Sequence, residues 1–204
     1  MRIWDLCSGT GSVSRVWREA GHETLTLDID PKCSPGICQD IMTWEYTYFG
    51  LGPPDLIWCS PTCTQYSIAR SKAKTPRDLE GADAIVQRCL GIIAYWRPKY
   101  WVIENPQTGL LKTREVVQGL PYKAEDYCMY GAPYRKRTRL WTNCAWIPRP
   151  LRTHTSHQMT AQKGPSKRAD QLIQGVDCSL HTLHSVPQGL TMEIMLHCTN
   201  EALS

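Results

Sequence analysis

The stretch that decides the fold is Asp5-Leu6-Cys7-Ser8-Gly9-Thr10-Gly11-Ser12, in which an apolar strand beginning at Ile3 runs into a glycine-rich turn. Glycine permits a tight turn and lets the backbone approach a ligand closely. Beyond this turn, four residues follow the spacing of a buried helix face: Val13, Val16, Trp17 and Ala20. A strand, a turn and a helix in this order predict the first unit of an open α/β sheet.

The alternation of strand and helix continues outward through the first 145 residues. Apolar runs predict strands over residues 23–27, 54–58, 100–103 and 140–144, and a helical stripe covers residues 82–93. This order predicts the α/β class with a doubly wound, mostly parallel sheet formed by residues 1–145. The amino-acid composition changes after residue 145. The composition of residues 146–204 predicts a small irregular C-terminal extension that ends in a closing helix.

Composition narrows the class of protein. The 204 residues suit one domain, and 42% hydrophobic with 21% charged residues excludes a wholly disordered chain. The longest apolar stretch, residues 90–96, is too short to cross a bilayer, and no secretory signal precedes the first strand, so we expect a cytoplasmic protein without a membrane partner. The ten cysteines form no Cys-x-x-Cys pair, which argues against a disulfide framework.

Charge is strongly segregated along the chain. Residues 127–169 carry nine cations and no Asp or Glu, whereas the charges of residues 1–126 nearly cancel. Such a segment favours a polyanionic partner, above all nucleic acid, over the alternative of a solvated basic face. The nine cations are Arg135, Lys136, Arg137, Arg139, Arg149, Arg152, Lys163, Lys167 and Arg168.

Reactive or acidic residues follow three of the predicted strands. Cys63 lies shortly after the strand ending at Trp58, Glu104 directly follows another strand, and Asp28 ends the second strand. Because parallel strands place their carboxyl ends at one edge of a sheet, we expect these side chains beside the glycine-rich turn. That turn alone fits a dinucleotide or S-adenosylmethionine equally well.

Together, these residues resemble the DNA (cytosine-5)-methyltransferases over about residues 1–145. The resemblance implies a Rossmann-like, S-adenosylmethionine-dependent methyltransferase fold. It also implies that Cys63 is the nucleophile, that Glu104 grips the ring of the target base, and that Arg137 and Arg139 belong to the catalytic arginine motif. The cofactor-binding residues that it implies are Asp5, Leu6, Cys7, Ser8, Gly9, Thr10, Gly11, Ser12, Asp28, Ile29, Asp40, Ile41, Ser60 and Pro61.

The implied reaction makes further demands on the site. A thiolate that adds to carbon 6 of cytosine creates an enamine, which attacks the methyl group, and a carboxyl group at ring nitrogen 3 assists the addition. We therefore expect cations or N–H groups that depress the pKa of Cys63. The base must leave the duplex, and a mobile basic loop over residues 66–77 is expected to close over the DNA. The expected DNA contacts are Arg70, Lys72, Lys74, Arg135 and Lys136.

Several positions depart from the family pattern. Thr62 and Thr64 replace the proline and glutamine of the nucleophile motif, and Cys7 replaces an aromatic residue of the turn. Little chain follows Arg139, where family members carry a large target-recognition region and then a Gly-Asn motif. We therefore expect a separate specificity subunit, or a second copy of the chain in a homo-oligomer, to supply target recognition.

Alternatives remain open at this point. Ser60-Pro61 also resembles the motif of exocyclic-amino DNA methyltransferases, and the family allows RNA cytosine-5 methylation, transfer of a modified methyl group, or a non-catalytic DNA-binding module. Cys59 is the alternative nucleophile. A zinc site is weighed in the tail, but its spacing fits no tight metal motif, so we predict no metal; its candidate ligands are His154, His157, Cys178, His181 and His184.

Overall fold

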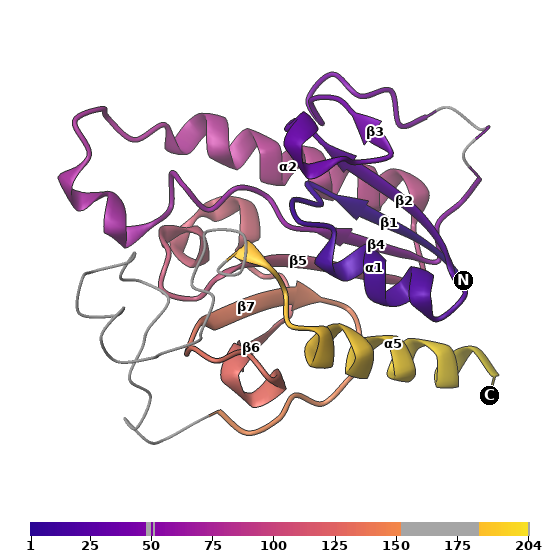
Figure 1. Cartoon of the computed structure of the whole chain (residues 1–204). Coiled ribbons are helices and arrows are strands. Elements are labelled where there is room, and N and C mark those ends of the chain that lie inside the picture. Colours follow the sequence, from indigo (N-terminus) through magenta and orange to yellow (C-terminus); the bar gives the residue numbers. More distant parts are fainter. Residues whose placement is uncertain (48–49, 51, 152–183, 204) are drawn as a thin grey trace.

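The computed structural model describes residues 1–47, 50, 52–151 and 184–203, and in that part of the chain seven strands form one sheet (Figure 1). The strand order is β3-β2-β1-β4-β5-β7-β6. Only β7 runs against its neighbours, so the sheet is mostly parallel. The strands are β1 (Arg2–Leu6), β2 (Glu23–Asp28), β3 (Ile37–Cys38), β4 (Leu56–Cys59), β5 (Tyr100–Pro106), β6 (Tyr122–Asp126) and β7 (Arg137–Thr142).

Three α-helices of the described chain cover both faces of the sheet (Figure 1). Helix α1 (Ser12–Glu19) and helix α5 (Gln188–Leu203) pack on one face, where Trp17 and Ile194 share a core with the strand residue Ile3. Helix α2 (Leu79–Trp96) covers the other face, and its apolar stripe contacts strand residues such as Ile57. The predicted doubly wound α/β fold is therefore confirmed.

Short 3-10 helices fill the connections: η1 (Pro31–Cys33), η3 (Ile68–Lys72), η4 (Leu110–Thr113), η5 (Glu115–Val117) and η6 (Tyr127–Tyr130). The structure adds two strands that apolar periodicity did not predict, the short β3 and the charged β6. No helix of the described residues is long and apolar enough to span a membrane.

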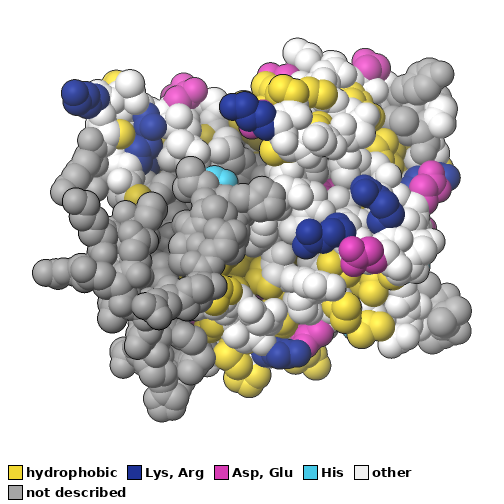
Figure 2. All heavy atoms as spheres, in the orientation of Figure 1, with side chains coloured by type: hydrophobic (Ala, Val, Ile, Leu, Met, Phe, Trp, Pro, Cys, Tyr) yellow, Lys and Arg dark blue, Asp and Glu magenta, His cyan; other side chains and the backbone are white. Residues whose placement is uncertain are grey.

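The closing helix is part of the main core. Val186, Leu190 and Cys198 are buried against residues of α1 and the sheet, although they belong to the segment predicted as a C-terminal extension. Residues 152–183 of that segment lie outside the described part of the chain. On the face shown in Figure 2, Lys and Arg side chains stand near Asp and Glu side chains in several places. Arg149 and Glu193 form one of the ion pairs of the described chain.

The turn after β1 depends on left-handed backbone. Gly9 and Gly11 have φ of 48° and 64°, a region that residues with a Cβ rarely adopt. The N–H of Gly11 donates to the carbonyl of Ser8 at 2.9 Å, which closes the turn just before α1. The turn therefore lies at the carboxyl edge of the sheet, where open α/β folds bind ligands.

Candidate active site

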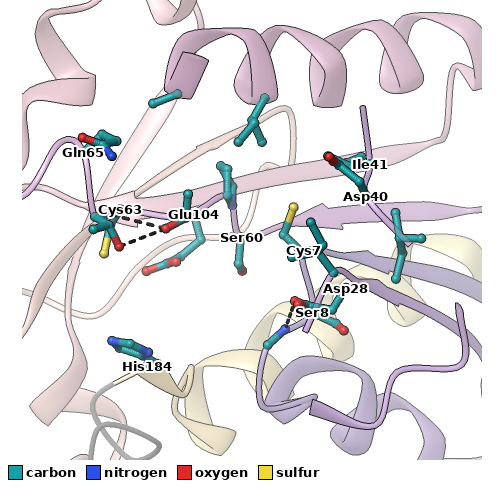
Figure 3. A pocket seen from close by; sticks show the side chains of 18 of the residues that line it. Cys7, Ser8, Asp28, Asp40, Ile41, Ser60, Cys63, Gln65, Glu104 and His184 are labelled. Atoms are coloured by element: carbon teal, nitrogen blue, oxygen red, sulfur yellow. Dashed lines mark hydrogen bonds between the residues drawn. The ribbon is translucent and has the colours of Figure 1, made fainter. Parts of the chain in front are cut away.

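A cavity of 640 Å³ opens at this edge of the sheet and is lined by residues at the ends of β1, β2, β3, β4 and β5. Its size lies within the range of about 300–1,000 Å³ typical of ligand sites. In Figure 3, Cys63, Gln65, Glu104 and His184 surround one end, and Cys7, Ser8 and Asp28 surround the other, with Ser60 between them. We call these the catalytic end and the cofactor end.

The cofactor end brings together most of the residues predicted for it. Asp28 accepts hydrogen bonds from the N–H of Gly9 at 2.7 Å and of Asp30 at 2.9 Å, so it fixes the turn while its side chain faces the cavity. The carboxylate of Asp40 accepts the N–H of Met42 at 2.9 Å. The predicted residues that line the cavity are Cys7, Ser8, Gly9, Ser12, Asp28, Ile29, Asp40, Ile41, Ser60 and Pro61.

Four of the predicted cofactor residues do not line the cavity: Asp5 and Leu6 at the end of β1, and Thr10 and Gly11 in the turn. Asp5 is buried and accepts the N–H of Ser14 at 3.0 Å, which ties the strand to the start of α1. Burial raises the pKa of Asp5 to about 7, against the opposing effect of that hydrogen bond. These four residues stabilise or form the turn, and their predicted contact with a cofactor stays a prediction.

A segment far along the chain completes the cavity. His184 and Val186 line it, and the N–H of Val186 donates to the Ser12 hydroxyl at 2.9 Å. The hydroxyls of Ser185 and Thr10 are 3.0 Å apart. Residues 184–186 therefore lie beside the glycine-rich turn and complete the cavity, although they contain no Gly-Asn motif. The sequence did not predict that this segment would line the cavity.

At the catalytic end, Cys63 lies in a turn that begins where β4 ends. The N–H of Tyr66 donates to the carbonyl of Cys63 at 3.1 Å, and the Asn105 amide donates to the carbonyl of Pro61 at 2.9 Å. Asn105 follows Glu104 on β5, the strand next to β4. The two segments carrying Cys63 and Glu104 are therefore fastened to each other.

Glu104 is nearly buried, with 7% of its surface exposed. Its Oε1 atom accepts the hydroxyl of Tyr127 at 2.8 Å and lies 3.6 Å from Nζ of Lys136. The same Lys136 nitrogen stands 4.7 Å from the centre of the Tyr127 ring. Lys136, predicted as a DNA contact, is thus a member of the catalytic end.

The expected depression of the Cys63 pKa is wrong for this structure. Burial raises the pKa of the Cys63 thiol above its ordinary value, and the charge of Glu104 adds to the rise, while Lys136 opposes it. A single cation does not compensate for desolvation and a neighbouring carboxylate. The thiol is therefore less acidic in this structure than an ordinary cysteine, because burial and Glu104 raise its pKa.

The arginines of the basic run lie apart from the cavity. Arg137 forms a two-pronged contact with buried Asp126, at 2.9 and 2.7 Å, and Arg135 lies 3.6 Å from the same carboxylate. Arg139 donates to the Gln107 side chain at 2.5 Å and stacks on Tyr122, 3.7 Å from the ring centre. Among the residues that line the cavity, Lys136 supplies the cationic side chain from this run.

The basic loop over residues 66–77 is folded against itself. Arg70 donates to the carbonyls of Thr75 and Pro76 at 3.1 and 2.8 Å, and Arg77 donates to the carbonyls of Gln65 and Ser67 at 2.5 and 2.8 Å. Lys74 is exposed, whereas the side chain of Lys72 lies outside the described part. The two arginines therefore stabilise the loop conformation.

Two alternatives from the sequence concern Cys59 as the nucleophile and a zinc site in the tail. Cys59 is fully buried beside Cys89 and does not line the cavity, whereas Cys63 does, which favours Cys63 as the reactive thiol. No cluster of metal-ligating side chains is found among the residues that the structure describes. Of the zinc candidates only His184 is described, and the others, His154, His157, Cys178 and His181, lie outside the described residues.

Comparison with solved structures agrees with the fold. An E. coli prophage protein described as a "putative DNA modification methyltransferase" matches with a TM-score of 0.54 at 16% identity, over 74% of this chain and 52% of that one. The Entamoeba histolytica methyltransferase EhMeth matches with a TM-score of 0.55 at 15% identity, over 87% of this chain and 61% of that one. This chain thus spans little more than half the length of these two solved proteins.

Sequence comparison is more specific. No family model matches the chain. A Frog virus 3 (isolate Goorha) protein named "Probable DNA (cytosine-5)-methyltransferase" is 37% identical over 157 residues, a match that covers 70% of this chain and 71% of that protein. Identity at this level over most of both sequences, joined to the sheet and cavity described above, places the chain in the DNA (cytosine-5)-methyltransferase family.

Proposed function

We propose that the protein transfers the methyl group of S-adenosylmethionine to carbon 5 of cytosine in DNA, with Cys63 as the nucleophile. The observation that carries the proposal is that Cys63, in the turn after β4, and Glu104, on the neighbouring parallel strand β5, both line the cavity that also holds the glycine-rich turn. A nucleophile, a carboxyl group and a cofactor site in one cavity are what this transfer requires.

The cofactor end suits S-adenosylmethionine. A Cβ at Gly9 would meet no atom within 4 Å, so the cavity wall is backbone that a ligand can approach directly. Asp28 presents a carboxylate for ribose hydroxyls, and Ile29, Asp40 and Ile41 lie where an adenine would be held. When bound, S-adenosylmethionine supplies an electrophilic methyl group.

Cys63 and Glu104 activate the cytosine ring at two different atoms. The Cys63 sulfur adds to carbon 6, the carbon 5–carbon 6 double bond opens, and its electron pair becomes available at carbon 5 for the new carbon–carbon bond. Glu104 is placed to face ring nitrogen 3, where its carboxylate stabilises the proton that this nitrogen takes up from solvent as the adduct forms. Loss of the carbon 5 proton to a base then restores the double bond and expels the Cys63 thiolate.

Lys136 and Tyr127 prepare the carboxyl group for this task. Tyr127 holds Oε1 of Glu104 in place, and Lys136 supplies positive charge on the same side of the cavity. That charge also favours the thiolate of Cys63. We assign Lys136 the cationic role at the catalytic end, and Arg137 and Arg139 a role in shaping β7 and in contacts with DNA.

A cytosine reaches this cavity only after leaving the duplex. Arg70, Lys72, Lys74 and Arg135 are the proposed backbone contacts, and release of Arg70 from its own loop carbonyls is the expected accompaniment of DNA binding. Target selectivity is assigned to a separate subunit or to a second copy of this chain.

The test is base analysis by mass spectrometry after incubating the protein with methyl-labelled S-adenosylmethionine and cytosine-containing DNA. Label in 5-methylcytosine is the expected result, and a parallel RNA arm is expected to remain unlabelled. Label in N4-methylcytosine or in RNA alone, or no label despite measured cofactor binding, would contradict the proposed function.

A further inference from the structure

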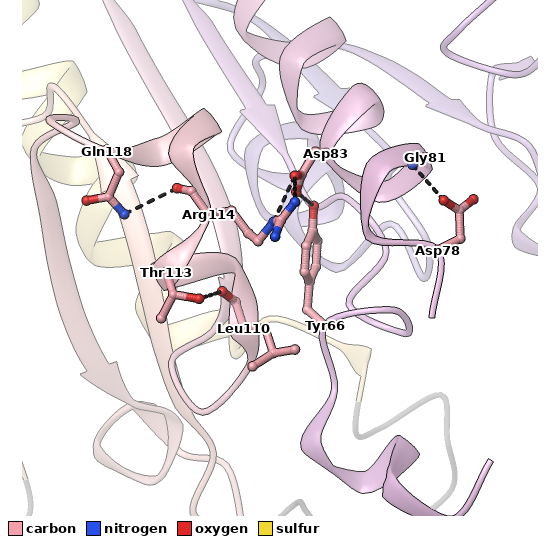
Figure 4. Close-up of polar contacts among 8 residues, drawn as sticks. All are labelled: Tyr66, Asp78, Gly81, Asp83, Leu110, Thr113, Arg114 and Gln118. Carbon is pink, nitrogen blue, oxygen red and sulfur yellow. Dashed lines mark hydrogen bonds and ion pairs between the residues drawn. The ribbon is translucent and has the colours of Figure 1, made fainter. Parts of the chain in front are cut away.

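A polar cluster outside the cavity joins three distant segments of the chain: Tyr66, Asp83 and Arg114 (Figure 4). The hydroxyl of Tyr66 donates to Oδ1 of Asp83 at 2.8 Å. Two nitrogens of Arg114 contact Oδ2 of the same carboxylate, at 2.8 and 2.6 Å. Each carboxylate oxygen therefore has its own donor, and the aspartate is held from two sides.

The cluster lies where the parts of the catalytic end meet. Tyr66 closes the Cys63 turn, Asp83 belongs to α2, and Arg114 lies between η4 and η5, in the segment that follows Glu104 and β5. The N–H of Leu110 also donates to the carbonyl of Tyr66 at 3.0 Å. Through Tyr66, the turn that carries the nucleophile is fastened to the segment that follows Glu104.

The contacts are sheltered enough to act as a rigid link. Tyr66 is fully buried, and the side chains of Asp83 and Arg114 expose 21% and 33% of their surface. Hydrogen bonds to a charged group are stronger than neutral ones, and a phenol held by a carboxylate has little freedom to shift. Next to Asp83 on α2, Ala82 lines the cavity, so the helix that holds the link also forms part of the ligand site.

We propose that Tyr66 is a positioning residue whose hydroxyl, held by Asp83 and Arg114, sets where Cys63 stands relative to Glu104. The inference rests on the proposed function and adds a residue that touches neither the base nor the cofactor. Displacement of a reacting group by about 1 Å can reduce a rate by about 100-fold. Removing the hydroxyl therefore affects catalysis more than its distance from the cavity suggests.

The experiment compares Tyr66→Phe with Tyr130→Phe in the full chain. Tyr130 is a matched control, because its hydroxyl donates at 2.8 Å to the buried carboxylate of Glu125, away from the Cys63 turn. Both variants lose one phenol–carboxylate bond; Tyr130→Phe also removes the acceptor of the Arg149 N–H, so its fall in Tm is expected to be at least as large. Only Tyr66→Phe is expected to lower kcat, by about 10- to 100-fold, with the Kd for S-adenosylmethionine unchanged.

A second readout needs no methyl transfer. Alkylation of Cys63 by iodoacetamide, followed by peptide mass spectrometry, is expected to be several-fold faster in Tyr66→Phe and unchanged in Tyr130→Phe, because the freed turn exposes the thiol. Arg114→Gln, which keeps Tyr66 but releases Asp83, is expected to change kcat and alkylation in the same directions. Equal alkylation rates in all three variants and the wild type would overturn the positioning role, whether or not the wild type methylates DNA.

Discussion

The two ends of the cavity are built in different ways. The cofactor end is centred on one local turn, in which the left-handed glycines Gly9 and Gly11 shape the wall and Asp28 fixes it from the next strand. The catalytic end has no local template, because Cys63, Glu104 and Lys136 come from three separate segments and meet through tertiary packing. A motif can specify the first end, whereas the second depends on how the whole sheet is assembled.

The largest expected effect is a loss of methyl transfer at the catalytic end with cofactor binding unchanged. Cys63→Ala is predicted to reduce methyl transfer by at least about 10³-fold, because no other thiol of the described chain lies at the catalytic end. Binding of S-adenosylmethionine, measured by calorimetry, is expected to stay within about twofold of the wild type, since the cofactor end is intact. A variant that keeps normal turnover would remove Cys63 from its role.

The next comparison is within the basic run. Lys136→Ala is predicted to lower kcat by about 10- to 100-fold, because it removes the charge that lies 3.6 Å from Glu104. Arg139→Ala is the comparison variant from the same run: its guanidinium contacts Gln107 and Tyr122 outside the cavity, and saturating DNA offsets any DNA contact that it loses. Single-turnover kinetics at saturating DNA measures the difference, and a larger loss in Arg139→Ala would reverse the assignment of the cationic role.

A substitution at the cofactor end is predicted to weaken cofactor binding and to leave the reactivity of Cys63 unchanged. Asp28→Ala is expected to raise the Kd for S-adenosylmethionine by about 10-fold, because hydrogen bonds to a charged group contribute about 1.5–3 kcal/mol. Asp30→Ala is the control, since that acid is exposed and lies outside the cavity lining. Iodoacetamide should modify Cys63 at the wild-type rate in both, and a changed rate in Asp28→Ala would show that the two ends are not independent.

The smallest effect concerns the ionisation of Cys63. Its pKa is raised by burial and by Glu104 and lowered by Lys136, so alkylation is expected to speed up as pH rises toward this raised pKa. Glu104→Gln removes a negative charge, lowers the pKa and should make alkylation at pH 8 a few-fold faster; Lys136→Ala should make it slower. Methyl transfer is predicted to fall in both variants. Alkylation changes of the same sign in both would contradict this electrostatic balance.

Much of the fold follows from apolar periodicity, but one strand does not. Strand β6 has the sequence Tyr-Lys-Ala-Glu-Asp, which is typical of an exposed loop. Its acids are buried because Tyr130 donates to Glu125 and Arg137 pairs with Asp126. Those partners come from other segments, so the sequence of the strand itself carries no signal of its burial.

The candidate site shows the same division. The place of Cys63 and Glu104 at the cavity was predictable from the sequence. Cys63 lies just after β4, Glu104 lies near the carboxyl end of β5, and the carboxyl ends of parallel strands share an edge. Which member of Arg135-Lys136-Arg137 faces the cavity was not predictable, because a shift of one residue reverses the direction of a side chain. The role of His184 and Val186 depends on the return of α5 to the first turn, far away in sequence.

The most direct test of the central claim is a covalent trap. DNA containing 5-fluorocytosine blocks the final elimination, because fluorine replaces the proton that must leave carbon 5. Incubated with S-adenosylmethionine, the protein is predicted to form a stable adduct with this DNA, and peptide mass spectrometry should place the linkage on Cys63 and find none in Cys63→Ala. Absence of an adduct under conditions in which the cofactor binds, or an adduct at another cysteine, would contradict the account.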